Sequence, residues 1–197
     1  MDGDGELNFP GYFVDWPTHE QPDEKAGMRA IGIMAMKKAI ELLREFGRDP
    51  VPAEEILARL LKVEIQVQKS KQVLGLKHFA TGLTDEDQKA LVSGGARGMS
   101  TFMSYYILKA VASFDKESAV EMMKEYYGGM LDKGATTFWE DFDIEWTNGS
   151  CRIDELPTEG ELDIHGDFGA FCYKGFRHSL CHGWSAGVIG FMKEENV

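Results

Sequence analysis

The sequence predicts an all-α fold with its helices in two layers. Two segments, 23–46 and 99–114, carry apolar residues on nearly every side, which is typical of helices packed on all sides. Segment 53–69 and the segment after Asp115 instead carry one apolar stripe at helical spacing, with polar residues opposite. Because the two kinds of helix alternate along the chain, we expect an inner layer of buried helices covered by an outer layer.

Capping residues predict where several of these helices begin and end. Asp23 is expected to cap the first long helix, which ends before Gly47. A further helical segment covers about 70–81. The run 84–87 (TDED) resembles a capping box and predicts a short helix that ends at the glycine pair 94–95.

Two tracts are predicted to lie outside regular helices. The opening loop, 8–22, is rich in aromatic residues and proline, and the tract 146–176 is rich in Asp, Gly and aromatics. We expect the second tract to be a long ordered loop with one hairpin, and such loops in compact domains are usually functional. A last helix is expected over about 179–194.

Composition restricts the classes of protein to which the chain can belong. Its 197 residues, 43% apolar and 27% charged, are typical of one globular domain, and no apolar run is long enough to span a membrane. A formal charge of −12 argues against nucleic acid and anionic lipid as partners. The first residues, MDGDGE, do not resemble a signal peptide. Three cysteines allow at most one disulfide.

Two motifs near the carboxyl end carry the chemistry. The first, 134–140 (GATTFWE), sets Glu140 beside a tryptophan, and the second, 179–187 (SLCHGWSAG), sets His182 beside Trp184. A carboxylate, an imidazole and indole faces are the groups needed to hold a sugar ring and activate a water beside it. The alternative is a capping box in which Glu140 bonds back to the N–H of Thr137.

Taken together, several stretches resemble the catalytic domain of family 78 glycoside hydrolases, the α-L-rhamnosidases. They lie in the same order over almost the whole chain: 13–16 (FVDW), 98–108, 134–140, 163–169 (DIHGDFG) and 176–187. The resemblance implies an (α/α)6 toroid, inverting hydrolysis and terminal α-L-rhamnose as the sugar released. It also implies that an intact parent protein is periplasmic or secreted.

Two parts of that family have no counterpart in the sequence: the acidic segment that supplies the general acid, and the β-sandwich that commonly follows the toroid. We therefore expect residues 1–197 to form a single domain, about the carboxyl-terminal half of the toroid. Its expected parts are an active-site loop (1–22), helical hairpins (23–133), the catalytic-base motif (134–145), a loop (146–178) and the last helix (179–195).

The resemblance assigns roles to three residues besides giving Glu140 that of general base. It makes Trp16 a wall for the apolar face of the sugar, and Asp15 a partner of a sugar hydroxyl. It makes His182 a partner of the hydroxyl next to the scissile carbon. Each has an alternative: Trp16 could be a core tryptophan, Asp15 a helix-side cap and His182 a structural histidine. The catalytic interpretation requires the Glu140 carboxylate to project into an open hollow walled by indole rings.

The remaining tryptophans receive no separate catalytic role. Trp139 and Trp146 are expected to line the sugar pocket or to brace it, and Trp184 is interpreted as structural. No cofactor is expected. A zinc site at Cys172, His178, Cys181 and His182 has suitable residue types but not the spacing of a common zinc finger. The glycine-rich run 94–98 is a loop rather than an anion site.

Two classes of function stay open on the sequence. In the first, the chain carries half of a glycosidase active site and binds a carbohydrate substrate. In the second, it is a helical carbohydrate-binding or scaffold domain without catalysis. In either case half of a toroid would expose an apolar face, so we expect a homo-oligomer or association with the missing half of the domain.

Overall fold

A computed structural model describes residues 5–8, 11–18, 22–168 and 178–197. These residues are mostly helical, which confirms the all-α prediction. The α-helices of this part are α1 (Glu24–Glu45), α2 (Val51–Leu60), α3 (Lys71–Thr81), α4 (Asp85–Val92), α5 (Ser104–Ala112), α6 (Lys116–Asp132) and α7 (Gly187–Glu195). Shorter elements are the 3-10 helices η1 (Trp16–Thr18), η2 (Ile144–Thr147) and η3 (Gly183–Ala186) and the strands β1 (Ser150–Cys151) and β2 (Leu162–Asp163).

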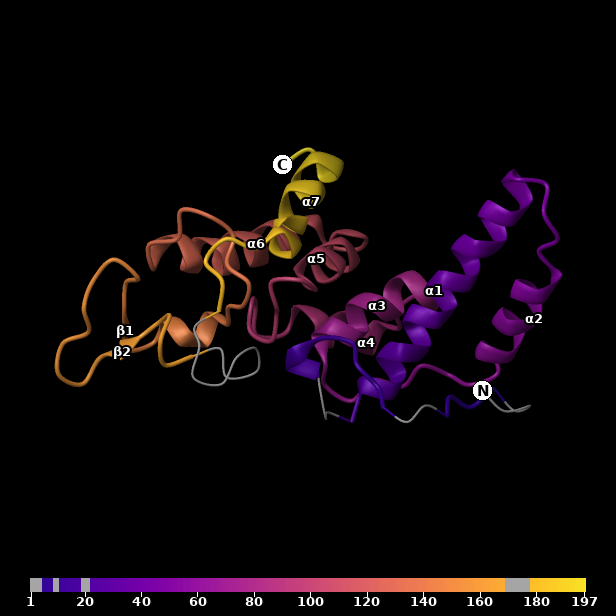
Figure 1. Cartoon of the computed structure of the whole chain (residues 1–197), viewed down its shortest axis with the longest axis horizontal. Helices are drawn as coiled ribbons and strands as arrows, with labels where there is room; N and C mark the ends of the chain where they lie inside the picture. The colour runs from indigo at the N-terminus through magenta and orange to yellow at the C-terminus, as the bar shows by residue number, and fades with distance from the viewer. Residues whose placement is uncertain (1–4, 9–10, 19–21, 169–177) are drawn as a thin grey trace.

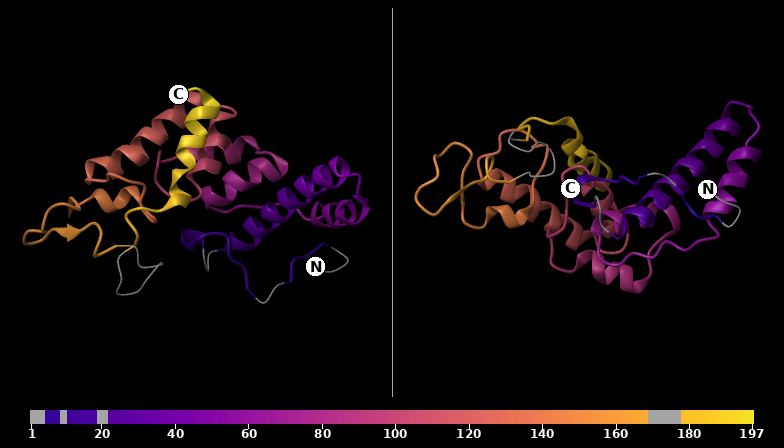
Figure 2. Two further views of the ribbon diagram at one scale, coloured as in Figure 1. Left: turned by 45° about the horizontal axis from the view of Figure 1, so that its top comes forward. Right: turned by 60° about the horizontal axis from the view of Figure 1, so that its bottom comes forward.

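The helices are spread along the longest axis of the molecule, and α7 returns to lie against α5. Helices α1 and α2 form one end, and the loop that carries β1 and β2 forms the other (Figure 1, Figure 2). Helices α3 and α5 occupy the middle: α3 packs on α1, α4 and α5, while α5 packs on α6 and α7 as well. None of the helices in the described ranges combines the length and apolarity needed to cross a bilayer.

The close approach of α3 and α5 depends on Gly75. A Cβ atom at this position would lie 3.1 Å from the backbone nitrogen of Ile107 in α5. Ile107, Leu108 and Val111 of α5 are fully buried at this junction. The prediction that the segment 99–114 lies inside is correct for this part of α5 but wrong for Phe102 and Phe114, which are 39% and 36% exposed, and the α-helix begins only at Ser104.

The prediction that the first helix is buried on all sides is wrong for its carboxyl-terminal half. Ala30 and Ile33 are fully buried, but Phe46, just after the helix, is 72% exposed. The reason is visible in Figure 1: α1 extends beyond α3, so that only α2 lies along its far end.

Asp23 does not cap α1 through its side chain, contrary to the prediction. Its carboxylate instead accepts hydrogen bonds from the backbone N–H groups of Gln68, Lys69 and Ser70, at 2.8, 2.9 and 2.8 Å. The predicted helix 53–69 is too long at its carboxyl end, since α2 ends at Leu60 and the N–H groups of residues 68–70 bind Asp23 rather than helical carbonyls. Asp23 thereby ties the start of α1 to the start of α3.

Other local predictions are confirmed. Thr84 and Asp87 form the capping box at the start of α4, and Asp115 caps α6 by accepting a bond from the N–H of Ser118. The tract 146–168 is irregular, but its two strands pair in parallel, so the predicted hairpin is wrong for this part of the loop. The rest of the tract, 169–176, lies outside the described residues.

The last helix begins later than predicted. Residues 179–182 form no helix, and helical structure starts only with η3 and α7. The backbone of this segment pairs with residues 138–140: the N–H of Glu140 donates to the carbonyl of Ser179, and that of His182 to the carbonyl of Phe138, both at 2.8 Å. This pairing brings the two sequence motifs side by side.

Candidate functional site

Glu140 is held by the segment that precedes α7. Its Oε2 accepts a hydrogen bond from the backbone N–H of Ser179 at 2.8 Å. The capping-box alternative is wrong, because no helix begins at Thr137 and the hydroxyl of Thr137 donates to the carbonyl of Leu180. The side chain does not project into an open hollow either, since Glu140 is only 6% exposed. The carboxylate therefore lies in a narrow, mostly enclosed position between two segments.

The backbone of Glu140 is fixed from two further directions. Its carbonyl oxygen accepts a bond from the Thr101 hydroxyl at 2.5 Å and another from the Trp184 indole N–H at 2.8 Å. Thr101 is itself buried. A carbonyl with two side-chain donors has both of its lone pairs occupied, so the position of Glu140 is strongly constrained.

Asp15 is attached to the same short segment as Glu140. The hydroxyl of Ser100 donates to Asp15 Oδ2 at 2.6 Å, and the N–H of Trp16 donates to Oδ1 at 2.9 Å. Ser100 and Thr101 are consecutive, so this segment holds two carboxylate-bearing residues that are far apart in the sequence. The structure thus ties the Asp15 side chain and the Glu140 backbone to neighbouring residues of one segment.

A third carboxyl, Asp141, was not singled out from the sequence. Burial raises its pKa to about 6, and the negative charges of Asp15, Asp143 and Glu140 add to the effect. Burial also raises the pKa of Asp15, although its bonds from Ser100 and Trp16 oppose this. Asp141 Oδ2 is buried without a hydrogen-bond partner among the described residues. Asp141 therefore takes up a proton around pH 6, at a higher pH than an ordinary aspartate does.

His182 and Trp184 lie on the other side of Glu140. Their ring centroids are 4.2 Å apart, and His182 Nδ1 is buried without a partner in the part of the chain that the structure describes. Trp184 braces Glu140, as its structural interpretation predicted, yet the residue is 36% exposed. It is therefore both a support for the carboxylate-bearing residue and a surface open to solvent.

The other tryptophans take different positions. Trp139 is 1% exposed and packs edge-on against Phe142, so it braces the core and does not line a pocket. Trp146 stacks on Phe168, with centroids 5.2 Å apart, and does not reach Glu140 through any contact of the described residues. Trp16 is half-buried and packs against Phe13, at the start of η1 beside Asp15.

His178 is buried between the rings of Trp139 and Trp146. Burial lowers its pKa to about 4, with a further contribution from the nearby His165. Neither of its ring nitrogens has a hydrogen-bond partner within the described ranges. His178 is thus a neutral histidine in the core. It directly precedes Ser179, the residue whose N–H donates to Glu140.

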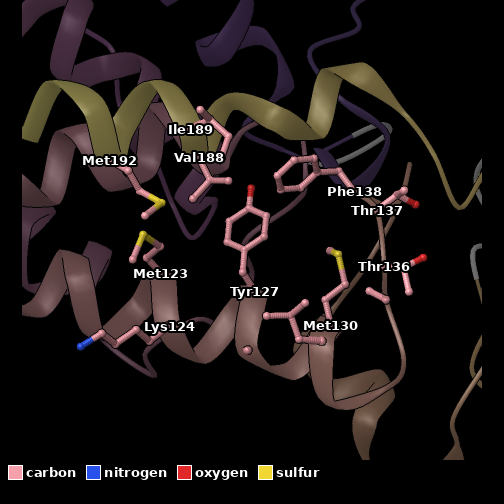
Figure 3. Close-up of a pocket in the computed structure, with 13 residues that line it drawn as sticks. Met123, Lys124, Tyr127, Met130, Thr136, Thr137, Phe138, Val188, Ile189 and Met192 are labelled. Atoms are coloured by element: carbon pink, nitrogen blue, oxygen red, sulfur yellow. The ribbon is translucent and has the colours of Figure 1, made fainter. Parts of the chain in front are cut away.

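An apolar hollow lies elsewhere, between α6 and α7 (Figure 3). It has a volume of about 440 Å³ and an almost entirely apolar lining, which includes Met123, Tyr127, Phe138 and Val188. Glu140 does not line it. The hollow therefore does not supply the open, carboxylate-bearing pocket that the sequence predicted.

The zinc alternative gains no support from the described residues. No group of three or more His, Cys, Asp or Glu side chains among them is arranged to hold a metal ion. Cys172, one of the four proposed ligands, lies outside the described residues, while Cys181 is exposed and Cys151 buried, both as free thiols.

Sequence reasoning missed Ser100, Thr101 and Asp141 as parts of the site. The stretch 98–108 was included in the family resemblance, but no property of Ser or Thr in the sequence indicates that they hold carboxylate-bearing residues. Asp141 follows Glu140 directly, and that adjacency was the only signal of its place. Comparison with known proteins adds nothing further: no protein-family model, no curated protein and no solved structure matches the chain.

Proposed function

We propose that this chain forms part of an inverting glycoside hydrolase that releases terminal α-L-rhamnose, with Glu140 as the general base. The observation that carries the proposal is the attachment of Asp15 and Glu140 to the consecutive residues Ser100 and Thr101. Residues of two motifs that the resemblance assigns to one active site thus meet at one place. As the finer part of the same proposal, the helices form about half of an (α/α)6 toroid.

In this proposal Glu140 takes a proton from the attacking water. An inverting enzyme places its two carboxyl groups about 6.5–9.5 Å apart, with the water beside the base. The general acid would come from outside this chain. Asp15 and His182 would bind sugar hydroxyls, and Trp16 would pack against the apolar face of the ring. Burial raises the pKa of Asp141, the neighbour of Glu140, to about 6, so Asp141 is mostly ionised at neutral pH and takes up a proton only in mild acid.

One observation favours the second class of function. Glu140 is nearly enclosed, and one of its carboxylate oxygens already accepts a bond from Ser179. A non-catalytic carbohydrate-binding or scaffold domain needs no water at this position. The two proposals share the sugar but differ in turnover, so an activity measurement separates them.

The deciding experiment joins this chain to the segment that precedes it in the parent reading frame and measures hydrolysis of an aryl α-L-rhamnoside. We expect turnover, and we expect Glu140→Gln to lower it by about 10²–10⁴-fold, the usual contribution of a general base. Glu121→Gln, at an exposed position in α6, is the matched control and should leave turnover unchanged.

The outcomes are distinct. Turnover that survives Glu140→Gln would show that another group is the base. Rhamnose binding without turnover in the joined protein would favour the second class. The isolated chain should hydrolyse little or nothing, and turnover by this chain alone at the level of an intact glycosidase would contradict the proposed absence of the general acid.

The proposed association with a second copy, or with the rest of the toroid, is measured separately. The exposed apolar side chains Leu131 and Ile189, beside the hollow of Figure 3, support it. Light scattering over a range of concentrations should give a mass above 22.1 kDa for the isolated chain. A monomer at high concentration would contradict this part of the proposal.

A further inference from the structure

Trp184 and Phe102 form an exposed pair of aromatic rings beside Glu140. Phe102 is 39% exposed and Trp184 36% exposed, and their ring centroids lie 6.0 Å apart with the planes inclined at 53°. Phe102 immediately follows Thr101, and Trp184 follows His182 by two residues. Both rings are thus next to residues that the site already contains, and we call the pair the aromatic platform.

Neighbouring residues hold both rings of the platform in position. The Trp184 N–H is used in the bond to the Glu140 carbonyl, so the indole cannot turn without losing that bond. Phe102 packs against Tyr106 of α5, whose ring in turn packs edge-on against Phe79 of α3. A ring that is fixed before a ligand arrives loses little conformational freedom on binding, which favours affinity.

The surroundings of the platform indicate the chemistry of its ligand. Exposed aromatic rings offer apolar contact, and neither ring carries a charge. The net charge of −12 disfavours an anionic ligand. A neutral pyranose matches this surface, because one face of the sugar ring presents C–H groups that pack on aromatic rings.

We propose that the aromatic platform of Phe102 and Trp184 binds a second sugar residue of the substrate, next to the sugar whose bond is cut. The substrate class is then a neutral oligosaccharide or polysaccharide that carries terminal rhamnose, rather than a rhamnoside of a small aglycone. This inference rests on the proposed function for its sugar chemistry, but it adds a binding position that the catalytic roles do not require.

The experiment compares binding of methyl α-L-rhamnopyranoside with that of neutral rhamnose-terminated disaccharides and trisaccharides, measured on the joined protein by saturation-transfer NMR and calorimetry. Phe102→Ala should weaken the longer ligands about 3–10-fold, the amount expected for one aromatic contact, and leave the single sugar unchanged. Phe102→Tyr keeps the ring and should bind like the wild type. Phe46→Ala removes an exposed ring outside the platform and is the control.

The experiment distinguishes a failure of the platform from a failure of the proposed hydrolysis, because one is measured by binding and the other by turnover. Binding of oligosaccharides that Phe102→Ala leaves unchanged would overturn the platform, even if the protein turns over rhamnosides. Binding that depends on Phe102, without any turnover, would support the platform and overturn the hydrolysis. Light scattering gives a further outcome. If Phe102→Ala converts a dimer to a monomer and leaves sugar binding unchanged, the two rings form a contact with a second copy of the chain, and the inference is wrong.

Discussion

The indole N–H of Trp184 donates a hydrogen bond to the backbone carbonyl of Glu140 over 2.8 Å, although 44 residues separate the two. The bond joins the two motifs that carry the candidate chemistry. It fixes the backbone of the proposed base and the orientation of an exposed ring at the same time. Any change at Trp184 is therefore expected to alter the position of Glu140 as well as the surface beside it.

Asp141 should make the protein more stable in mild acid. Its pKa is about 6 in the folded state against 3.8 as the ordinary value, so the folded state binds the proton more tightly. The sign follows: this contribution is complete below pH 4 and is lost as the pH rises through 6. It amounts to about 3 kcal/mol. Urea unfolding at several pH values should show that the free energy of unfolding of the wild type falls by this amount relative to that of Asp141→Asn between pH 4 and pH 7. A constant difference would contradict the prediction.

His178 should affect stability with the opposite dependence on pH: its contribution is lost in mild acid. Its pKa is about 4 in the folded state against an ordinary value of 6.5, so the unfolded chain takes up the proton first. The contribution is complete above pH 6.5 and is lost as the pH falls towards 4, again by about 3 kcal/mol. His178→Phe, which keeps an aromatic ring between Trp139 and Trp146, should remove this loss. NMR of the imidazole should find it neutral at pH 5, and a charged ring at that pH would disprove the assignment.

Gly75 and Gly128 form a matched pair of helical glycines. At Gly75 an added Cβ would lie 3.1 Å from the backbone of Ile107, whereas at Gly128 nothing lies within 4 Å. We expect Gly75→Ala to destabilise the protein by about 1–3 kcal/mol, because α3 and α5 must separate. Gly128→Ala should stabilise it by about 0.5–1 kcal/mol, since alanine favours the helix. Chemical unfolding measures both, and equal effects would show that the α3–α5 approach is not tight.

Asp23 should matter more to stability than an exposed aspartate with a similar local bond. Its buried carboxylate accepts three backbone N–H bonds, whereas Asp49 accepts one, from Val51, at an exposed position. Asp23→Ala is expected to cost about 3 kcal/mol and Asp49→Ala less than about 1 kcal/mol. Hydrogen exchange at Gln68, Lys69 and Ser70 should accelerate only in Asp23→Ala. Unchanged exchange there would mean that the segment is held by other contacts.

Local signals in the sequence were sufficient to predict the position of most helices. The capping box at Thr84 and the cap at Asp115 depend on residues within one turn of each other, so their chemistry is visible in the chain itself. The same holds for the all-α class, which follows from helical spacing of apolar residues. Where the prediction failed, contacts with a distant segment had replaced the local ones: the Asp23 carboxylate accepts bonds from residues 68–70, and residues 179–182 bond to residues 138–140.

By itself, then, the sequence determined the helical class, most helix boundaries and the motifs that contain Glu140 and His182, because these depend on spacing along one segment. Tertiary structure alone decided that Ser100 and Thr101 hold Asp15 and Glu140, that Asp141 lies among the negative charges that raise its pKa, and that Trp139 is core while Trp184 is open. Each of these depends on contacts between segments far apart in the chain, and on burial that no spacing pattern measures.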